Sequence, residues 1–443
     1  MNNLTFMNLR HRLILIAAVF LFGAMSSYVT AQKPSSLEVE RGRIMLKTIK
    51  EDLKKYYYDP QYRGMDVEAK FKQADERIKT ATSLGQIFGI IAQVLIDLND
   101  SHTFFLPPER AYTTEYGWEV QMVGDKALVT AVKPGSDAEA KGLTPGDQIL
   151  SADGVELTRN NLWIFRYLYN ALRPQPGIRV EVTKPDGRTQ ELAIAAKVRQ
   201  GKGVVDLTGQ DLNDYIRELE DQSRQRRHRY VEYGDELFIW KMPRFDMEKS
   251  EVDAFVNKFR KRKALILDLR GNGGGYEETL LRLLGNMFDH DVKVGDIKTR
   301  KEEKPIVAKT RGNEIFAGKL IVLIDSASGS ASELFARMIQ LEKRGVVIGD
   351  VSSGAVMRSR AHDHQLGIDT VVPYAASITE ADIKMTDGKS LEHVGVVPDE
   401  IKLPTGADLA ARRDPVLAYA ATLLGVELSA EKAGALFPIE WKK

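Results

Sequence analysis

The fold is decided by the stretch Ile321-Val-Leu-Ile-Asp-Ser-Ala-Ser-Gly-Ser-Ala-Ser-Glu-Leu-Phe-Ala336. Its apolar beginning predicts a buried strand over Lys319 to Asp325, and apolar residues at helical spacing predict a helix over Ser332 to Gln340. A helix N-terminus favours negative charge, so a hydroxyl at this corner is well placed for a reaction that passes through an oxyanion. Ser330 is therefore a candidate nucleophile, although serine is also a common helix N-cap.

A second stretch of this kind lies upstream, in Leu265-Ile-Leu-Asp-Leu-Arg-Gly-Asn-Gly-Gly-Gly275. A buried-type strand runs into a glycine-rich turn, and a helix is expected from about Glu277. Consecutive glycines allow backbone N–H groups to converge, which is typical of an oxyanion or phosphate cradle. Tyr276 stands at the third glycine position of the dinucleotide fingerprint, and no Gly-Lys-Ser/Thr follows, so neither nucleotide-binding motif is present.

The pattern along the chain predicts the order of the domains. Helical periodicity dominates from Leu37 to Asp100, strands dominate from about Tyr112, and short apolar strands alternate with amphipathic helices from Leu237 onward. The last pattern is typical of a layered α/β core. We expect a signal peptide over residues 1–31, a helical region over 32–110, a strand-rich domain over 111–200 and the α/β core over 201–443.

Two further segments carry residues of catalytic type. Leu98-Asn-Asp-Ser-His102-Thr-Phe-Phe follows a helical stretch, and Asp387-Gly-Lys-Ser-Leu-Glu392-His-Val-Gly-Val-Val-Pro-Asp399 lies near the end. Together with the first two stretches, they resemble the C-terminal-processing (tail-specific) and tricorn-type serine peptidase family, from about Leu37 to Thr405. The resemblance implies a crotonase/ClpP-like layered α/β core, an N-terminal helical segment, an inserted PDZ domain and Ser330 as nucleophile.

The residue that would act as base departs from one branch of that family. Tail-processing members use a Ser–Lys dyad, but the matching segment Gly349-Asp-Val-Ser-Ser-Gly-Ala355 carries Ala355 at the lysine position. Tricorn-like members use Ser, His and Glu, which match residues present here. A histidine can accept and return the serine proton, and a carboxylate can orient the ring. The resemblance thus implies Ser330, His102 and Glu392 as catalytic residues, an oxyanion hole from the amides of Ala331 and of Gly273 or Gly274, and Ser101 as a minor candidate. Taken singly, His102 also fits a structural histidine, and Glu392 a solvated loop charge.

The strand-rich domain has a recognisable motif of its own. Lys133-Pro-Gly-Ser-Asp-Ala-Glu-Ala-Lys-Gly-Leu-Thr-Pro-Gly-Asp-Gln-Ile-Leu-Ser-Ala-Asp-Gly154 resembles a PDZ domain of the bacterial protease type. Such domains add a peptide end as a strand to a sheet edge and hold its carboxylate with backbone amides. Tyr116, Gly117 and Trp118 form the candidate carboxylate loop. The alternative is that Gly117 forms an ordinary turn and the domain only packs.

Composition limits the classes of partner and chemistry. There are 63 basic and 62 acidic residues and a net charge of +1, which indicate neither nucleic acid nor an anionic membrane as partner. The absence of cysteine excludes a cysteine nucleophile, a thiolate metal site and disulfides. His362 and His364 share one face of a predicted strand, but no third ligand fits, so we expect an exposed hairpin and neither metal nor cofactor.

The beginning of the chain carries a secretion pattern. Basic residues from Arg10 to Arg12 precede an apolar run, Leu13 to Met25, and Val29-Thr-Ala31 offers a cleavage site near Ala31. An uncleaved anchor is the alternative. We expect a periplasmic or secreted protein without stable membrane insertion after cleavage, acting on protein or peptide substrates, with oligomerisation left open.

Three functions remain at this point. The first is an extracytoplasmic serine endopeptidase with a PDZ module. The second is a catalytically inactive relative that binds peptides or apolar ligands, which the missing lysine favours. The third is a crotonase-type acyl-CoA enzyme, against which the secretion pattern counts, because coenzyme A is a cytoplasmic metabolite.

Overall fold

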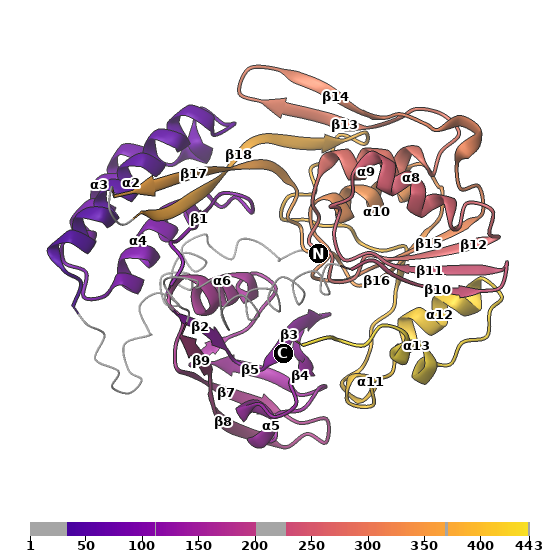
Figure 1. The fold of residues 1–443 in the computed structure, drawn as a ribbon, viewed down its shortest axis with the longest axis horizontal. Helices are drawn as coiled ribbons and strands as arrows, with labels where there is room; N and C mark the ends of the chain where they lie inside the picture. The colour runs from indigo at the N-terminus through magenta and orange to yellow at the C-terminus, as the bar shows by residue number, and fades with distance from the viewer. Residues whose placement is uncertain (1–32, 111, 201–226, 368–370, 442–443) are drawn as a thin grey trace, which may run out of the picture.

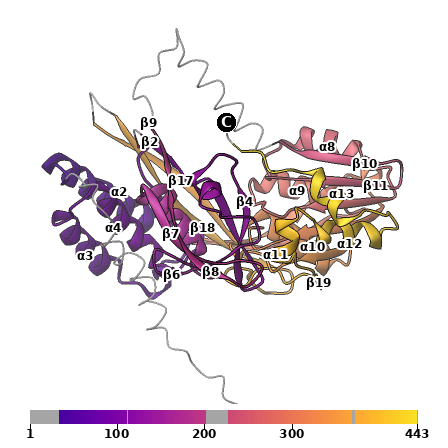
Figure 2. The ribbon, with the colours of Figure 1, turned by 90° about the horizontal axis from the view of Figure 1, so that it is seen from below.

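The computed structural model describes residues 33–110, 112–200, 227–367 and 371–441. The secretion pattern predicted over residues 1–31 lies outside the described residues. Helical, PDZ-like and α/β parts follow one another along the chain (Figure 1). Seen from below, the N-terminal helices and the α/β core lie at opposite ends, with the PDZ-like sheet between them (Figure 2). Among the described residues, no helix is long and apolar enough to cross a bilayer.

The N-terminal helices form a small bundle of their own. Ser35 caps the first helix through a capping box with Glu38, and one apolar face of each helix is buried. The bundle packs on a long β-hairpin that reaches out from the core (Figure 1). The elements are α2 (Ser36–Tyr56), η1 (Tyr62–Gly64), α3 (Val67–Lys79) and α4 (Leu84–Ile96), and the hairpin is β17 (Met357–Leu366) and β18 (Val372–Met385).

That hairpin belongs to a mixed sheet that links the bundle to the core. Strand β18 pairs along one edge with β17, and along the other edge first with β1 and then with β13. The other strands of this sheet are β1 (Phe104–Leu106), β13 (Val292–Thr299) and β14 (Glu303–Ala308). The short strand β1 comes directly after the His102 segment, so its pairing with β18 places that segment beside the core.

The middle domain is a separate antiparallel sheet with its own core. Its strand order is β3-β4-β5-β7-β8, so β3 lies at an edge. Its strands are β3 (Trp118–Val123), β4 (Lys126–Val132), β5 (Gln148–Ala152), β6 (Val155–Glu156), β7 (Gly177–Thr183) and β8 (Thr189–Ala195). The helices are α5 (Asp137–Ala140) and α6 (Leu162–Tyr167), which continues into η2 (Leu168–Leu172), and β2 (Tyr112–Glu115) pairs with β9 (Lys197–Gln200) outside the sheet.

The α/β core is built on a largely parallel sheet that is covered on both faces. Side chains of β12 alternate between the two faces: Leu265 and Leu267 face one apolar core, whereas Ile266 faces the other. The strands, in spatial order, are β10 (Arg229–Tyr233), β11 (Leu237–Lys241), β12 (Ala264–Asp268), β15 (Lys319–Ile324), β16 (Val346–Gly349) and β19 (Glu400–Ile401). Helices α8 (Lys249–Asn257), α9 (Glu277–Gly285) and α10 (Ala331–Leu341) cover one face, and α12 (Pro415–Leu423) and α13 (Ala430–Leu436) cover the other; η3 (Gly312–Glu314) and α11 (Gly406–Ala410) are connecting turns.

The sheet topology brings three loops to one edge. Strands β12, β15 and β16 are parallel neighbours, so the loops that follow them all lie at the carboxyl edge of the sheet. In open α/β sheets, this edge is where ligands bind. A mixed α/β architecture with a parallel core sheet is thereby confirmed, whereas the finer crotonase/ClpP-like layering stays a prediction.

Candidate active site

Ser330 lies at the junction of β15 and α10 in an unusual backbone conformation. Its φ of 54° and ψ of −116° are rare for a residue with a side chain and cost about 1–3 kcal/mol. The amide of Ser330 donates to the carbonyl of Ala355 at 2.9 Å and to Glu333 Oε2 at 2.9 Å. A Cβ on Gly274 would come within 2.6 Å of Ser330 Cβ, so only glycine fits opposite the serine. The Ser330 corner thus contacts two other loops, the one after β16 and the glycine-rich loop after β12.

His102 and Glu392 are joined through Ser101. The Ser101 hydroxyl lies 2.7 Å from His102 Nδ1 and donates to Glu392 Oε2 at 2.8 Å. The Ser101 amide also donates to Glu392 Oε1 at 2.9 Å. The resemblance led us to expect the carboxylate next to the imidazole, and Ser101 only as a minor candidate. The hydroxyl instead stands between the two groups.

This arrangement determines which nitrogen of His102 is available. An ionised carboxylate only accepts hydrogen bonds, so the single hydroxyl proton of Ser101 points to Glu392. The oxygen of Ser101 then accepts the proton on Nδ1 of His102, which leaves the lone pair on Nε2. Burial lowers the pKa of His102, although the carboxylates of Glu392 and Asp100 raise it. The imidazole is therefore neutral at neutral pH, which is the form a general base needs.

Glu392 is a buried residue, and it is linked to the nucleophile through one peptide segment. Its side chain also accepts a hydrogen bond from the amide of Val356 at 2.9 Å. The preceding residue is Ala355, whose carbonyl accepts from the Ser330 amide. The loop after β16 therefore contacts both Glu392 and Ser330. Among the described contacts, no hydrogen bond joins the Ser330 hydroxyl directly to the His102 ring.

Asp100 holds the loop that carries the base. Its carboxylate accepts from the amides of His102 at 2.9 Å and Thr103 at 3.0 Å. It also accepts from the hydroxyls of Thr379 at 2.6 Å and Tyr57 at 3.1 Å, which fixes the loop to β18 and α2. The nearby motif Leu98-Asn-Asp-Ser-His102 contains Asp100, but its sequence alone does not reveal these distant partners.

The two glycines proposed for the oxyanion hole, Gly273 and Gly274, lie in different surroundings. The amide of Gly274 donates to Asn272 Oδ1 at 2.8 Å, and Gly274 is buried. Gly273 is exposed, and nothing lies within 4 Å of the position of a Cβ there. Of the two glycines that the sequence suggests, Gly273 is therefore the better candidate to donate its amide to an oxyanion. The other nominated amide belongs to Ala331, the first residue of α10, where helix N–H groups lack intrahelical acceptors.

The residue at the start of the glycine-rich loop, Arg270, connects this loop to the C-terminal helices. Arg270 forms bidentate contacts with Asp268 at 2.9 and 2.8 Å and with Asp414 at 3.0 and 2.7 Å. Asp414 is the N-cap of α12. Bidentate Arg–carboxylate pairs combine strength with fixed geometry, so this cluster fixes the start of the loop relative to β12 and α12.

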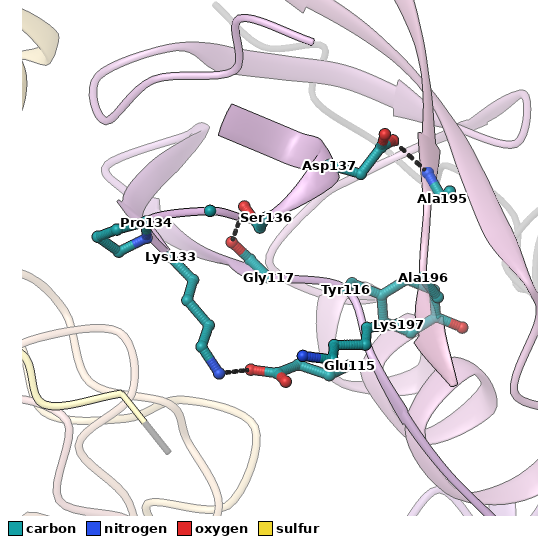
Figure 3. A pocket seen from close by; sticks show the side chains of 11 residues that line it. Glu115, Tyr116, Gly117, Lys133, Pro134, Ser136, Asp137, Ala195, Ala196 and Lys197 are labelled. Carbon is teal, nitrogen blue, oxygen red and sulfur yellow. Dashed lines mark hydrogen bonds and ion pairs between the residues drawn. The ribbon is translucent and has the colours of Figure 1, made fainter. Parts of the chain in front are cut away.

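The nominated carboxylate loop of the PDZ-like domain borders a cavity of about 210 Å³ (Figure 3). Tyr116 and Gly117 line this cavity, and Gly117 has a φ of 76° with Ser136 too close to admit a Cβ. The hydroxyl of Tyr116 accepts from the amide of Gln175 at 3.0 Å, and Trp118 is buried in the domain core. The remaining lining comes from Glu115, Lys133 to Asp137 and Ala195 to Lys197.

Two carbonyls of edge strand β3 already have partners. Arg166 of α6 donates to the carbonyl of Val120. Ser326, on the loop that leads to Ser330, donates to the carbonyl of Met122 at 2.5 Å. The edge at which a peptide would be added is therefore in contact with the nucleophile loop.

His362 and His364 lie on the predicted hairpin, but the expectation that they are exposed was wrong. His362 stacks on Tyr56 with ring centroids 4.1 Å apart, and His364 Nε2 lies 2.5 Å from Asp52 Oδ2. Tyr56 and Asp52 belong to α2, so this helix contacts both rings and leaves each only partly exposed. Within the described ranges, no group of three or more His, Cys, Asp or Glu side chains is placed to hold a metal ion.

Two ranges of the chain match known protein families. Residues 239–401 match peptidase family S41, and residues 115–196 match the PDZ domain. The tail-specific protease of Haemophilus influenzae is 26% identical over 340 residues, covering 72% of this chain and 46% of that protein. Tricorn protease homolog 2 of Streptomyces coelicolor is 25% identical over 390 residues, covering 84% of this chain and 31% of that protein. The chain thus spans less than half the length of either relative.

A solved structure shows the same fold. Mature CPAF superposes with a TM-score of 0.62 at 16% identity, covering 85% of this chain and 95% of that chain. At this identity, the likeness concerns the fold alone. The matched S41 range includes Ser330 and Glu392, whereas His102 lies in the part of the chain before the PDZ match.

Proposed function

We propose that the chain is an extracytoplasmic serine endopeptidase, because residues 239–401 match peptidase family S41 and residues 115–196 match the PDZ domain. Ser330 is the nucleophile, His102 is the general base, and Glu392 acts on the base through Ser101. Its substrates are proteins or peptides, whose C-termini bind the PDZ domain.

The proposed reaction begins with attack of the Ser330 oxygen on the scissile carbonyl carbon. A C–O bond forms while the hydroxyl proton moves to Nε2 of His102. The amides of Gly273 and Ala331 stabilise the oxyanion. The Nδ1–H of the imidazolium keeps donating a hydrogen bond to the Ser101 oxygen, and the Ser101 hydroxyl keeps donating to Glu392. The negative charge of Glu392 therefore stabilises the imidazolium through this hydroxyl. His102 then protonates the leaving amine, and a water molecule activated by the same base hydrolyses the acyl-enzyme.

The hydrogen-bonded series from Glu392 through Ser101 to His102 carries this proposal. It supplies a base in the correct tautomer without the lysine that Ala355 replaces. A catalytically inactive relative needs no such series, because binding a peptide requires no proton acceptor. This observation favours the peptidase over the binding protein, the alternative that the missing lysine suggests.

Labelling by a fluorophosphonate tests the proposal, because only an activated serine is acylated rapidly. The wild-type protein should be labelled at Ser330 and should cleave casein, whereas Ser330→Ala should lose both properties with an unchanged circular dichroism spectrum. Ser250→Ala, an exposed serine on α8, is the matched control and should behave as wild type. Wild-type protein that neither labels nor cleaves would favour the inactive binding protein.

Two parts of the proposal rest on other observations. The match to a PDZ domain and the cavity beside Tyr116 and Gly117 support peptide binding; a peptide added along β3 would replace the contacts that Arg166 and Ser326 make with its carbonyls. Binding of a peptide with a free C-terminus, and not of its amidated form, checks it.

Extracytoplasmic location is supported by the sequence pattern at residues 1–31. N-terminal sequencing of the exported protein should find the cleavage near Ala31.

A further inference from the structure

Glu333 is a buried carboxylate beside the nucleophile that the reaction described above does not use. It is the third residue of α10, and its side chain is fully buried. Buried glutamates are rare unless they are paired or saturated with hydrogen bonds. The donors that reach this carboxylate from the described residues are neutral amides and hydroxyls rather than cations. Oε2 accepts from the amides of Ser330 at 2.9 Å and Ala355 at 3.0 Å, and Oε1 accepts from the amide of Gly354 at 2.7 Å and the hydroxyl of Ser352 at 2.6 Å.

These four hydrogen bonds, together with a longer fifth one from the Ser353 hydroxyl to Oε2 at 3.4 Å, join two different loops. One loop carries Ser330 at its strained corner, and the other follows β16. The second loop is the one that contacts both ends of the proposed machinery: the Ala355 carbonyl accepts from Ser330, and the Val356 amide donates to Glu392. A single carboxylate therefore fixes the nucleophile corner and, through the next peptide, the position of Glu392.

The ionised form is the one that fits this network. Every donor listed above presents a hydrogen to the carboxylate, so a protonated carboxyl group would turn its own O–H toward another donor. Burial raises the pKa of Glu333 to about 7, although the hydrogen bonds from Ser352, Gly354, Ala355 and Ser330 lower it. The N-terminal end of α10 adds a favourable potential for the negative charge.

Building on the proposed function, we propose that Glu333 is a positioning residue: its carboxylate holds Ser330 and the peptide from Gly354 to Val356 in the geometry that the acylation step needs. Glu333 does not touch the substrate. It sets the direction of the Ser330 hydroxyl relative to the base and to the oxyanion amides. Displacement of reacting groups by about 1 Å can lower a rate by on the order of a hundredfold.

The test measures the rate constant of fluorophosphonate acylation per labelled site, together with the final amount of label. Glu333→Gln keeps the size and one acceptor oxygen but points an amide N–H₂ at the donors. We expect its acylation rate constant and its kcat to fall on the order of a hundredfold, with KM within about threefold and complete labelling at long times. A merely structural role would lower the labelled fraction and leave the rate constant per site unchanged, and that result would overturn the inference.

Two more variants complete the design. Glu342→Gln, an exposed glutamate just past the end of α10, is the matched control and should keep the wild-type rate constant. If Glu333→Gln does not fold, Ser352→Ala removes one donor to the same carboxylate and should lower the rate constant about tenfold, the equivalent of one hydrogen bond. A wild-type rate constant in Ser352→Ala would then refute the inference. Failure of wild type itself to label at Ser330 would instead refute the proposed function.

Discussion

The proposed nucleophile corner and the proposed base are built in opposite ways. Ser330 and Glu333 lie within one strand-turn-helix unit, three positions apart in sequence. The base is assembled from distant parts of the chain, because Ser101 and Glu392 are 291 residues apart. The strand and helix of the corner are local, and the loop after β16 completes it through hydrogen bonds to Glu333 and Ser330. An assembled base depends on the docking of whole domains, so each half of the site should respond to different changes.

Removing His102 eliminates the proposed base, which is assembled from distant segments, while the corner that carries Ser330 stays intact. His102→Ala should lower kcat/KM by on the order of a thousandfold or more, as expected for a member of a catalytic triad. Steady-state cleavage of a fluorogenic peptide measures the loss. His290→Ala, an exposed histidine before β13, is the control and should retain full activity. Near-normal cleavage by His102→Ala would mean that another group accepts the Ser330 proton.

Removal of the bridging hydroxyl sharpens the comparison, because it separates the imidazole from its carboxylate without removing either. Ser101→Ala should lower kcat about 10- to 100-fold with KM nearly constant, since one orienting hydrogen bond is lost. Glu392→Gln should cause a loss of similar or greater size. In the double variant, the two losses should be far from additive, because both residues act on His102 as one unit. Additive losses would show that Ser101 and Glu392 act separately.

The dependence of kcat/KM on pH distinguishes the two halves in the wild-type enzyme. In the proposed mechanism, catalysis needs ionised Glu333 and neutral His102, so activity is full above both pKa values and falls as the pH drops. The pKa of Glu333 is raised to about 7 by burial, whereas burial lowers that of His102, so the corner should lose its function first.

We therefore expect an acidic limb with a midpoint near pH 7, where Glu333 becomes protonated, and about a tenth of the plateau rate one pH unit lower. In Glu333→Gln, the residual activity should show a midpoint at lower pH, set by His102 alone. The same midpoint in both proteins would assign the limb to the base and not to the corner.

The same contrast explains what could be predicted from the sequence. The strand predicted over Lys319 to Asp325 is β15, Lys319–Ile324, and the helix predicted over Ser332 to Gln340 is α10, Ala331–Leu341. Apolar periodicity and a run of small residues specify such a unit locally. The α/β core and the PDZ domain were predicted for the same reason, since each has motifs that lie within one segment.

Contacts between distant segments could not be predicted in this way. The bridging position of Ser101, the hydrogen bonds that saturate Glu333 and the engagement of the Gly274 amide by Asn272 all depend on how loops meet. The covering of His362 by Tyr56 of α2 is another example. Periodicity describes which face of an element is apolar, but it does not say which polar group of another element will lie against it.

The separation of 291 residues between Ser101 and Glu392 also has a consequence for biogenesis. In an unfolded chain, closing a loop of that length costs roughly 5 kcal/mol of entropy, so this contact forms only after the intervening domains have folded. Domains fold in order as the chain emerges, and Glu392 is made after both Ser101 and Ser330. Under the proposed function, a nascent chain therefore carries Ser330 before His102 is oriented, and the base becomes competent only after the Glu392 segment has been made and has docked.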